Sequence, residues 1–403
     1  MTRLEKMLLY VSEHNEFYRR RIAEHGIKNP LDITQYPVLT RRELQENRYN
    51  MFSDGYKSKY YNQQLKRQSS SGSTGIPVSV FWERDDYALS MLPLWRARRD
   101  LHGILPSDKV MKFITSDIGG KFGGGNRPQY YFESKNILNV KRASLLSEES
   151  YTELAEMIDS FSPRWLYIQP SVLHLLSLCY MRSWKKPPSS IKYIESVGET
   201  LSGTVKREAL DVFGVPVTNM YGSEEMNCIA YECGAGHMHV IEDNVFVEAN
   251  GEDSAGYDVI TNLCGRAMPL IRYEQGDIIT LDVTERACGC GLGKTVIKSI
   301  DGRTNEKIKV GGYELDSLLL TSAVTEVNNI YRNAISEFYF TYSPAKETLV
   351  CHLFIHGDER KWYGAIAGDI ISLLRRGFGD LMLETVENTE YRRGKGTILE
   401  VEK

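Results

Sequence analysis

The 403-residue chain lacks the long hydrophobic run that a membrane-spanning helix needs, because no stretch approaches about 18 apolar residues. It also lacks an excess of positive charge: 49 lysines and arginines against 53 aspartates and glutamates give a net charge of −4. This balance argues against a nucleic-acid partner and against binding to an anionic membrane surface. The N-terminus is charged from Arg3 onward and has no signal-peptide core, so we expect a cytoplasmic protein.

Cysteine is scarce, and the seven cysteines are an odd number that excludes complete pairing in intrachain disulfides. Four lie among apolar residues and are expected to be small buried side chains: Cys179, Cys228, Cys264 and Cys351. Cys233 precedes His237 and His239, and Cys288-Gly-Cys290 follows some fifty residues later. Two such segments suit a tetrahedral Zn²⁺ whose four protein ligands make it structural. Reduced side chains without metal are the alternative, and the spacing leaves His237 and His239 equally open.

Short apolar segments alternate with amphipathic segments between about residues 105 and 265. The expected strands are Lys109–Ile114, Arg164–Ile168, Ser190–Val197 and Val215–Met220. The expected helices are Glu148–Phe161, Pro170–Met181 and Ser202–Phe213. Strands that alternate with helices predict a parallel sheet covered by helices.

After Gly251 the alternation of strands and helices ends. Asp258–Asn262 and Ile278–Val283 predict strands of a separate β-rich layer. Beyond Arg303 the expected order is helix Leu315–Asn328, two strands, helix Arg360–Arg376 and a last strand. We therefore expect an α/β protein. Its large N-terminal domain, 1–303, combines mixed and parallel sheets, helices and a β-rich subdomain, and a small mobile C-terminal α+β domain, 304–403, follows. The polar stretch Asp301–Lys307 is the expected hinge.

The strongest local motif is Ser69-Ser-Ser-Gly-Ser-Thr-Gly-Ile-Pro-Val78, which precedes an expected strand, Val78–Trp82. Its glycines allow backbone amides to approach a phosphate, and its hydroxyls add donors. No lysine follows the second glycine, so the segment is not a P-loop of the GxxxxGK type. A flexible polar linker is the alternative interpretation.

Four weaker motifs follow along the chain. Tyr221-Gly-Ser-Glu-Glu225 comes directly after a strand, where a carboxylate can hold Mg²⁺ against nucleotide phosphates. Asp277 ends Arg272-Tyr-Glu-Gln-Gly-Asp277 and can accept hydrogen bonds from ribose hydroxyls, which Arg303 can also reach. Lys395 lies on a glycine-flanked basic segment. Taken singly, each is explained equally well by a surface turn, a solvated hairpin or a frayed tail.

Together, in number and order, these motifs resemble those of the adenylate-forming superfamily of acyl-CoA synthetases, peptide-synthetase adenylation domains and luciferases. Within it, the chain is most similar to the phenylacetate–coenzyme A ligases. That similarity is carried by Glu16–Arg20, Pro37–Leu44, Pro269–Tyr273 and Cys288–Gly291, and it spans nearly the whole chain.

The resemblance implies a role for each matching residue. The β,γ-phosphates would be bound by Ser70, Ser71, Gly72, Ser73, Thr74 and Gly75. Nucleotide and catalytic roles would fall to Gly198 and Glu199 near the adenine, Tyr221 as the first residue of the Tyr-Gly-x-Thr-Glu motif, Glu225 on Mg²⁺, Asp277 and Arg303 on the ribose, and Lys395 between the acid carboxylate and the α-phosphate. His239 matches the family's His-x-x-Glu-Asp pattern, which favours zinc ligands Cys233, His239, Cys288 and Cys290.

Three positions depart from the superfamily pattern: Val78 stands where many members have lysine, Glu224 replaces the threonine of the second motif, and Asn305 occupies the hinge. Glu224 adds a negative charge beside the phosphates.

The expected reaction is ATP-dependent activation of an aryl or arylacetic acid to an acyl-adenylate, with release of pyrophosphate and transfer to coenzyme A. Alternatives are transfer to an amine or a carrier-protein thiol, and a catalytically silent homologue. We expect the acid pocket to draw on Phe113–Asn126, Gln169–Ser171, Ser196–Gly198 and Asn219–Gly222, and a homodimer would fit the family.

Overall fold

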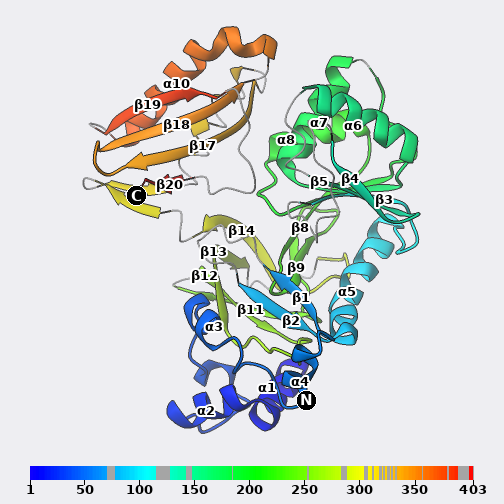
Figure 1. Ribbon diagram of the computed structural model, residues 1–403, viewed down its shortest axis with the longest axis vertical. Coiled ribbons are helices and arrows are strands. Elements are labelled where there is room, and N and C mark those ends of the chain that lie inside the picture. The colour runs from blue at the N-terminus through cyan, green and yellow to red at the C-terminus, as the bar shows by residue number, and fades with distance from the viewer. Residues whose placement is uncertain are drawn as a thin grey trace.

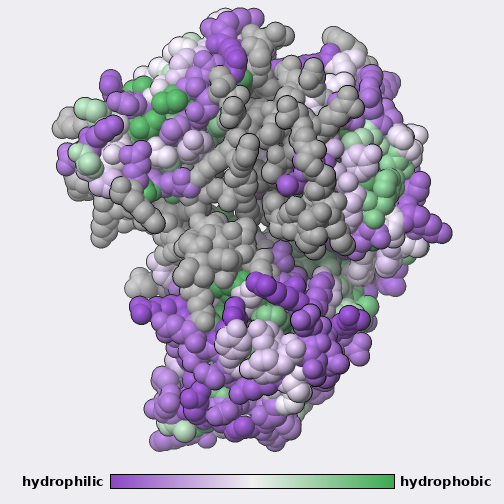
Figure 2. Space-filling model, viewed as in Figure 1, coloured by the Kyte–Doolittle hydropathy of each residue, from purple (hydrophilic) through white to green (hydrophobic). Residues whose placement is uncertain are grey.

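The structure is a computed structural model. It describes residues 1–69, 78–114, 128–141, 148–183, 185–251, 254–282, 288–303, 307–310, 313–316, 320, 323–324, 327, 330–331, 334–355, 357–378, 381–388 and 399–402. Within these ranges, no helix combines the length and the apolar character needed to cross a membrane. On the face drawn in Figure 2 the coloured residues are mainly hydrophilic, with hydrophobic residues in small separate groups.

The main element of the structure is a sheet of twelve strands, in the order β11-β12-β13-β14-β10-β9-β8-β7-β6-β3-β5-β4 (Figure 1). Its first half along the chain contains β3 (Val110–Ile114), β4 (Tyr130–Ser134), β5 (Ile137–Lys141), β6 (Trp165–Ile168), β7 (Tyr193–Val197) and β8 (Val217–Ser223). Its second half contains β9 (Asn227–Glu232), β10 (Met238–Val240), β11 (Val245–Asn250), β12 (Ala255–Asn262), β13 (Tyr273–Asp282) and β14 (Val296–Arg303).

Strands β5, β3, β6, β7 and β8 are parallel and have helices on both faces. Val110 and Trp165 face α5 (Arg84–His102), whereas Met111 and Leu166 pack with α6 (Glu148–Phe161), α7 (Pro170–Ser183) and α8 (Gly203–Phe213). This confirms the predicted helix-covered parallel sheet. Ser202 is the N-cap of α8, because its hydroxyl accepts a hydrogen bond from the Val205 amide at 3.2 Å.

Strands β9 to β14 are antiparallel to their neighbours. They continue the same hydrogen-bonded sheet as the parallel strands, whereas the sequence predicted a layer apart. A separate two-stranded sheet pairs β1 (Lys66–Ser69) with β2 (Ser79–Trp82), the strands on either side of the predicted phosphate loop in sequence.

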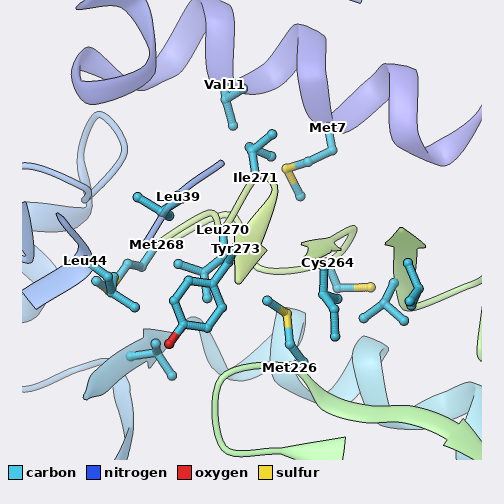
Figure 3. Close-up of a cluster of buried hydrophobic side chains, with 14 of the residues drawn as sticks. Met7, Val11, Leu39, Leu44, Met226, Cys264, Met268, Leu270, Ile271 and Tyr273 are labelled. Carbon is cyan, nitrogen blue, oxygen red and sulfur yellow. The ribbon is translucent and has the colours of Figure 1, made fainter. Parts of the chain in front are cut away.

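The N-terminal helices cover the antiparallel half of the sheet. They are α1 (Arg3–His14), α2 (Glu16–Glu24), the 3-10 helix η1 (Ile33–Gln35), α3 (Arg41–Asn47) and α4 (Tyr56–Tyr61). Met7 and Val11 of α1 lie against Ile271 in a buried cluster (Figure 3). Thr40 is the N-cap of α3 and forms a capping box with Glu43.

The C-terminal part has a sheet and a buried core of its own (Figure 1). The sheet has the order β19-β18-β17-β20, made of β17 (Ile335–Ser343), β18 (Thr348–Ile355), β19 (Met382–Glu387) and β20 (Leu399–Val401). The 3-10 helix η4 (Gly357–Trp362) leads into α10 (Tyr363–Phe378), and Ile366 and Ile370 of α10 pack with Phe340. A hairpin of β15 (Lys307–Val310) and β16 (Tyr313–Asp316) precedes this sheet.

Candidate active site and metal centre

The carboxyl ends of the parallel strands meet at one edge of the large sheet. Ile168 at the end of β6 is opposite Ser196 on β7, so the segments that follow both strands leave the sheet at this edge. The side-chain amide of Gln169 donates to the carbonyl of Phe113 near the end of β3 (Nε2–O 3.0 Å). Ligands of open parallel sheets bind at such an edge.

The turn after β7 has a defined shape. Gly198 has a φ of +75°, in the left-handed region that glycine adopts without steric cost. The Glu199 carboxylate accepts hydrogen bonds from the backbone amide of Ser171 (3.0 Å) and from its hydroxyl (3.2 Å). Because Ser171 lies in the first turn of α7, this carboxylate satisfies a free helix amide and holds the turn against the helix.

Two buried polar atoms at this edge, Ser196 Oγ and Gln169 Oε1, have no hydrogen-bond partner among the described residues. Their residues are 0% and 6% exposed. Buried polar atoms are almost always paired with protein, water or a ligand. The edge therefore suits a polar ligand that supplies the missing partners.

Two motifs from distant parts of the chain meet at Tyr221. Its hydroxyl oxygen lies 2.7 Å from Asp277 Oδ2 and 2.9 Å from Asp258 Oδ2, and it accepts a hydrogen bond from Gln275 Nε2 at 2.9 Å. Burial, reinforced by the two carboxylates, raises the pKa of Tyr221 well above its usual value. The hydroxyl therefore keeps its proton and can donate it.

The two glutamates of the Tyr221–Glu225 segment face different surroundings. Glu225 is 4% exposed, with Oε1 3.9 Å from Arg41 Nη1 and 3.4 Å from the Tyr273 hydroxyl. Glu224 is exposed and accepts a hydrogen bond from Gln68 Nε2 at 3.1 Å. Because Gln68 lies on β1, Glu224 is tied to the strand that leads into the predicted phosphate loop.

The predicted ribose-binding pair is placed together by strand pairing. Asp277 on β13 is directly opposite Arg303 on β14 in the register. The side chain of Arg303 lies outside the described atoms, so only the backbone placement is observed.

Several predicted site residues lie outside the described residues. These are Ser70, Ser71, Gly72, Ser73, Thr74, Gly75, Lys395, the hinge residue Asn305 and the glycine-rich stretch Asp117–Asn126. Their assigned roles stay predictions.

The four predicted zinc ligands come together from distant segments. One ligand atom each from Cys233, His239, Cys288 and Cys290 lies within 4.8 Å of the other three. The sulfur of Cys233 is 3.7 Å from that of Cys288, and Cys290 Sγ is 3.3 Å from His239 Nε2. Two or more thiolates with imidazole are the donor set that Zn²⁺ prefers, so the cluster fits this metal.

The two histidines have different positions beside the cluster. His239 is 1% exposed, and its Nδ1 hydrogen-bonds the Gly293 carbonyl at 2.6 Å, which leaves Nε2 directed at the sulfurs. A second hydrogen bond of this kind orients metal-binding histidines in general. His237 is exposed, and its Nδ1 lies 3.4 Å from Cys288 Sγ. Hydrogen bonds from His237 and then His239 lower the pKa of Cys288 to about 6, which favours the thiolate.

Sequence reasoning missed two residues that contact the predicted site. Arg41 lies beside Glu225, although the sequence analysis gave it no role beyond the family similarity of Pro37–Leu44. Asp258 lies beside Tyr221 and Asp277, although the sequence marked it only as part of a strand. A charged residue directly before the apolar pair Val259-Ile260 in a predicted strand was a usable signal.

Comparison with known proteins gives two relatives in sequence. The phenylacetate-coenzyme A ligase of Thermus thermophilus is 24% identical over 331 residues, covering 77% of this chain and 71% of the relative. The phenylacetate-coenzyme A ligase of Pseudomonas putida is 23% identical over 378 residues, covering 89% and 78%. No family model matches the chain.

Among solved structures, a 2-hydroxyisobutyryl-CoA ligase in the postadenylation state, bound to an acyl-adenylate, superposes with a TM-score of 0.72 at 16% identity. The match covers 100% of this chain and 88% of that one. An anthranilate CoA ligase bound to anthranoyl-AMP gives a TM-score of 0.55 at 13% identity, covering 82% of this chain and 65% of that one. The chain thus has the fold of the adenylate-forming enzymes. Its sequence similarity to phenylacetate–coenzyme A ligases confirms the predicted resemblance.

Proposed function

We propose that the protein is an AMP-forming acid–thiol ligase. It activates a carboxylic acid with ATP to an acyl-adenylate, releases pyrophosphate and transfers the acyl group to coenzyme A. The observation that carries this proposal is the contact between Tyr221 and Asp277, which joins two predicted nucleotide-binding motifs beside the edge where the parallel strands end. Similarity to acyl-CoA ligases over most of the chain supports it.

ATP would lie at this edge. Its ribose hydroxyls would donate to Asp277 with Arg303 nearby, and its adenine would lie against Gly198 and Glu199. The phosphates would be bound by the loop of Ser70 to Gly75. Carboxylate oxygens are the ligands that Mg²⁺ prefers, and Glu225 would hold this ion against the phosphates. Glu224, hydrogen-bonded to Gln68, would place a second carboxylate near the loop.

In the first step, a carboxylate oxygen of the acid attacks the α-phosphorus of ATP, and the bond to pyrophosphate breaks. Negative charge grows on the α-phosphate oxygens, and Lys395 would offset it. In the second step, the coenzyme A sulfur attacks the acyl carbon, its proton is lost, and AMP leaves. Residues 304–403 would form the mobile domain, turning about Asn305 to withdraw Lys395 between the steps.

The acid is proposed to be an aryl or arylacetic acid. The protein is proposed to act in the cytoplasm. The unpaired Ser196 Oγ and Gln169 Oε1 would hydrogen-bond either the adenylate or polar groups of this acid. Rapid pyrophosphate release from Mg-ATP is expected with one class in a panel of aryl, arylacetic, aliphatic and amino acids. Steady turnover is expected to require coenzyme A. Turnover that depends on an amine would select amide synthesis instead, and no release with any acid would favour a silent homologue.

We propose one structural zinc in each chain, held by Cys233, His239, Cys288 and Cys290. The zinc would tie the turn after β9 to the segment before β14, and it takes no part in the reaction steps.

Cys290→Ser and His239→Ala are each expected to reduce bound zinc from about one per chain to near zero, because three ligands hold the ion much less tightly than four. His237→Ala is expected to retain about one bound zinc per chain. Zinc content after dialysis, measured by mass spectrometry, tests this, with Cys179→Ser as the matched control. A chelator should lower the melting temperature of the wild type and of His237→Ala. Loss of zinc from His237→Ala with retention in His239→Ala would reverse the assignment.

A further inference from the structure

A buried group of acidic side chains lies beneath the predicted ribose site. Asp258 on β12 is 0% exposed, and Asp277 on β13 is 9% exposed. Both approach the hydroxyl of Tyr221 on β8, a strand far from them in the sheet order. The three side chains thus join two parts of the large sheet.

The number of protons in this group is fixed by its geometry. The Tyr221 oxygen lies within hydrogen-bond distance of Asp258 Oδ2 (2.9 Å) and of Asp277 Oδ2 (2.7 Å). A phenol hydroxyl has one proton and can donate to one carboxylate only. The Gln275 amide donates to the same oxygen and also hydrogen-bonds Asp258, but neither bond places a proton between the Tyr221 oxygen and Asp258 Oδ2. If both aspartates were ionised, Tyr221 could donate its proton to only one of them. The oxygen of the other carboxylate would then face the tyrosine oxygen with no proton between the two atoms.

The surroundings identify Asp258 as the protonated partner. Its Oδ1 accepts hydrogen bonds from the backbone amides of Gly276 (3.1 Å) and Asp277 (3.0 Å), which leaves Oδ2 toward Tyr221. Among the described side chains, the titratable groups that face it are Tyr221 from β8, and Asp277 and Tyr273 from β13, and none of these is a cation. The side chain of Arg303, opposite Asp277 on β14, lies outside the described atoms. Burial first, and then the charge of Asp277, raises the pKa of Asp258 well above its usual value.

We propose that Asp258 is held as a neutral carboxylic acid and is a positioning residue for nucleotide binding. Its proton is donated to the Tyr221 oxygen, and Tyr221 donates its own proton to Asp277 Oδ2. Asp277 then carries the only negative charge of the group and is held in one orientation. The role of Asp277 toward the ribose rests on the proposed function, whereas the protonation of Asp258 does not.

Comparing the variants Asp258→Asn and Asp258→Ala tests whether Asp258 is a neutral acid or a charged carboxylate. The asparagine carbonyl can accept from the same two backbone amides, and its NH₂ can donate to Tyr221, so this variant reproduces the protonated acid. We expect the KM for ATP and the dissociation constant of AMP within about twofold of the wild type. Asp258→Ala leaves buried donors unpaired, and both constants should rise about tenfold, with a smaller change in kcat. An equal loss in both variants would overturn the proposal.

Unfolding provides a test that does not depend on nucleotide. The folded chain keeps the Asp258 proton, whereas the unfolded chain releases it above about pH 4. Stability from this group is therefore present at low pH and falls as pH rises toward the raised pKa in the folded state. The melting temperature of Asp258→Asn minus that of the wild type should grow from pH 5 to pH 8.

The same substitution at the exposed residue Asp211 is the matched control, and its difference should not grow with pH. A pH-independent difference for Asp258→Asn would overturn the protonation. A growing difference without any ATP or AMP binding would keep the protonation and reject the proposed function instead.

Discussion

Replacing Lys395 with alanine is expected to slow acid-dependent pyrophosphate release by about 10²- to 10³-fold. The physical reason is the charge that develops on the α-phosphate as the acid oxygen attacks. An ammonium group positioned at that charge stabilises the transition state more than bound ATP, so the loss should fall mainly on kcat. Pyrophosphate release with saturating acid and ATP measures it.

A preformed acyl-adenylate makes the test specific to the first step. Thioester formation from that adenylate and coenzyme A should stay within about threefold of the wild type, because Lys395 acts before it. Arg392→Ala, three residues earlier in the same basic segment, is the matched control and should keep most of the activity. Adenylation at a near-normal rate in Lys395→Ala would remove the assigned role.

Much of the fold was predictable, because several elements carry complete local signals. The helix predicted at Glu148–Phe161 has the same bounds as α6. The helix predicted from Ser202 corresponds to α8, where Ser202 is the N-cap, and Thr40 is the N-cap of α3; each hydroxyl is followed three residues later by an amide that needs an acceptor. Periodicity and capping depend on near neighbours in sequence, which is why these predictions held.

The parts that were wrong depend on long-range pairing. Leu315 was expected to begin a helix, but it lies in β16, opposite Ile308 of β15. A hairpin partner overrides the helical preference of a short segment. The antiparallel strands were expected in a layer apart, but β9 pairs with β8 and extends the parallel strands into one sheet. Strand order depends on hydrogen bonds between segments that are far apart in the sequence, and no local sequence pattern identifies these partners.

For the site, the sequence identified separate motifs, and the structure adds which of them touch. The four cysteine and histidine ligands were predicted as one group, and their donor atoms lie together. The contact of Tyr221 with Asp277 joins motifs that the sequence could only place in order. Asp258 was not predicted as a site residue: its charge within a predicted strand is a signal in the sequence, but the second carboxylate beside it is not evident from a single sequence.

Replacing Glu195 with leucine is expected to lower the free energy of unfolding by about 3–5 kcal/mol. Glu195 on β7 is 0% exposed, and it accepts two hydrogen bonds from Arg98 of α5, which is 3% exposed (Nε–Oε2 2.8 Å, Nη2–Oε1 2.5 Å). The Arg98 guanidinium lies over the rings of Trp95 and Trp165, 4.4 and 4.9 Å from their centroids. Without Glu195 this cation stays buried among apolar groups and loses its counter-charge. Urea unfolding monitored by circular dichroism measures the loss.

The double variant Arg98→Met/Glu195→Leu separates the charge from the packing. Removing both partners leaves no uncompensated charge, so the double variant should be more stable than Glu195→Leu alone, within about 1–2 kcal/mol of the wild type. Tyr193, which donates to Glu195 at 3.0 Å, keeps the Tyr231 hydroxyl as a partner. Because β7 also carries Ser196 and leads into Gly198, restored stability should return nucleotide binding with it. If the double variant instead loses as much stability as Arg98→Met and Glu195→Leu together, the buried pair is not energetically coupled.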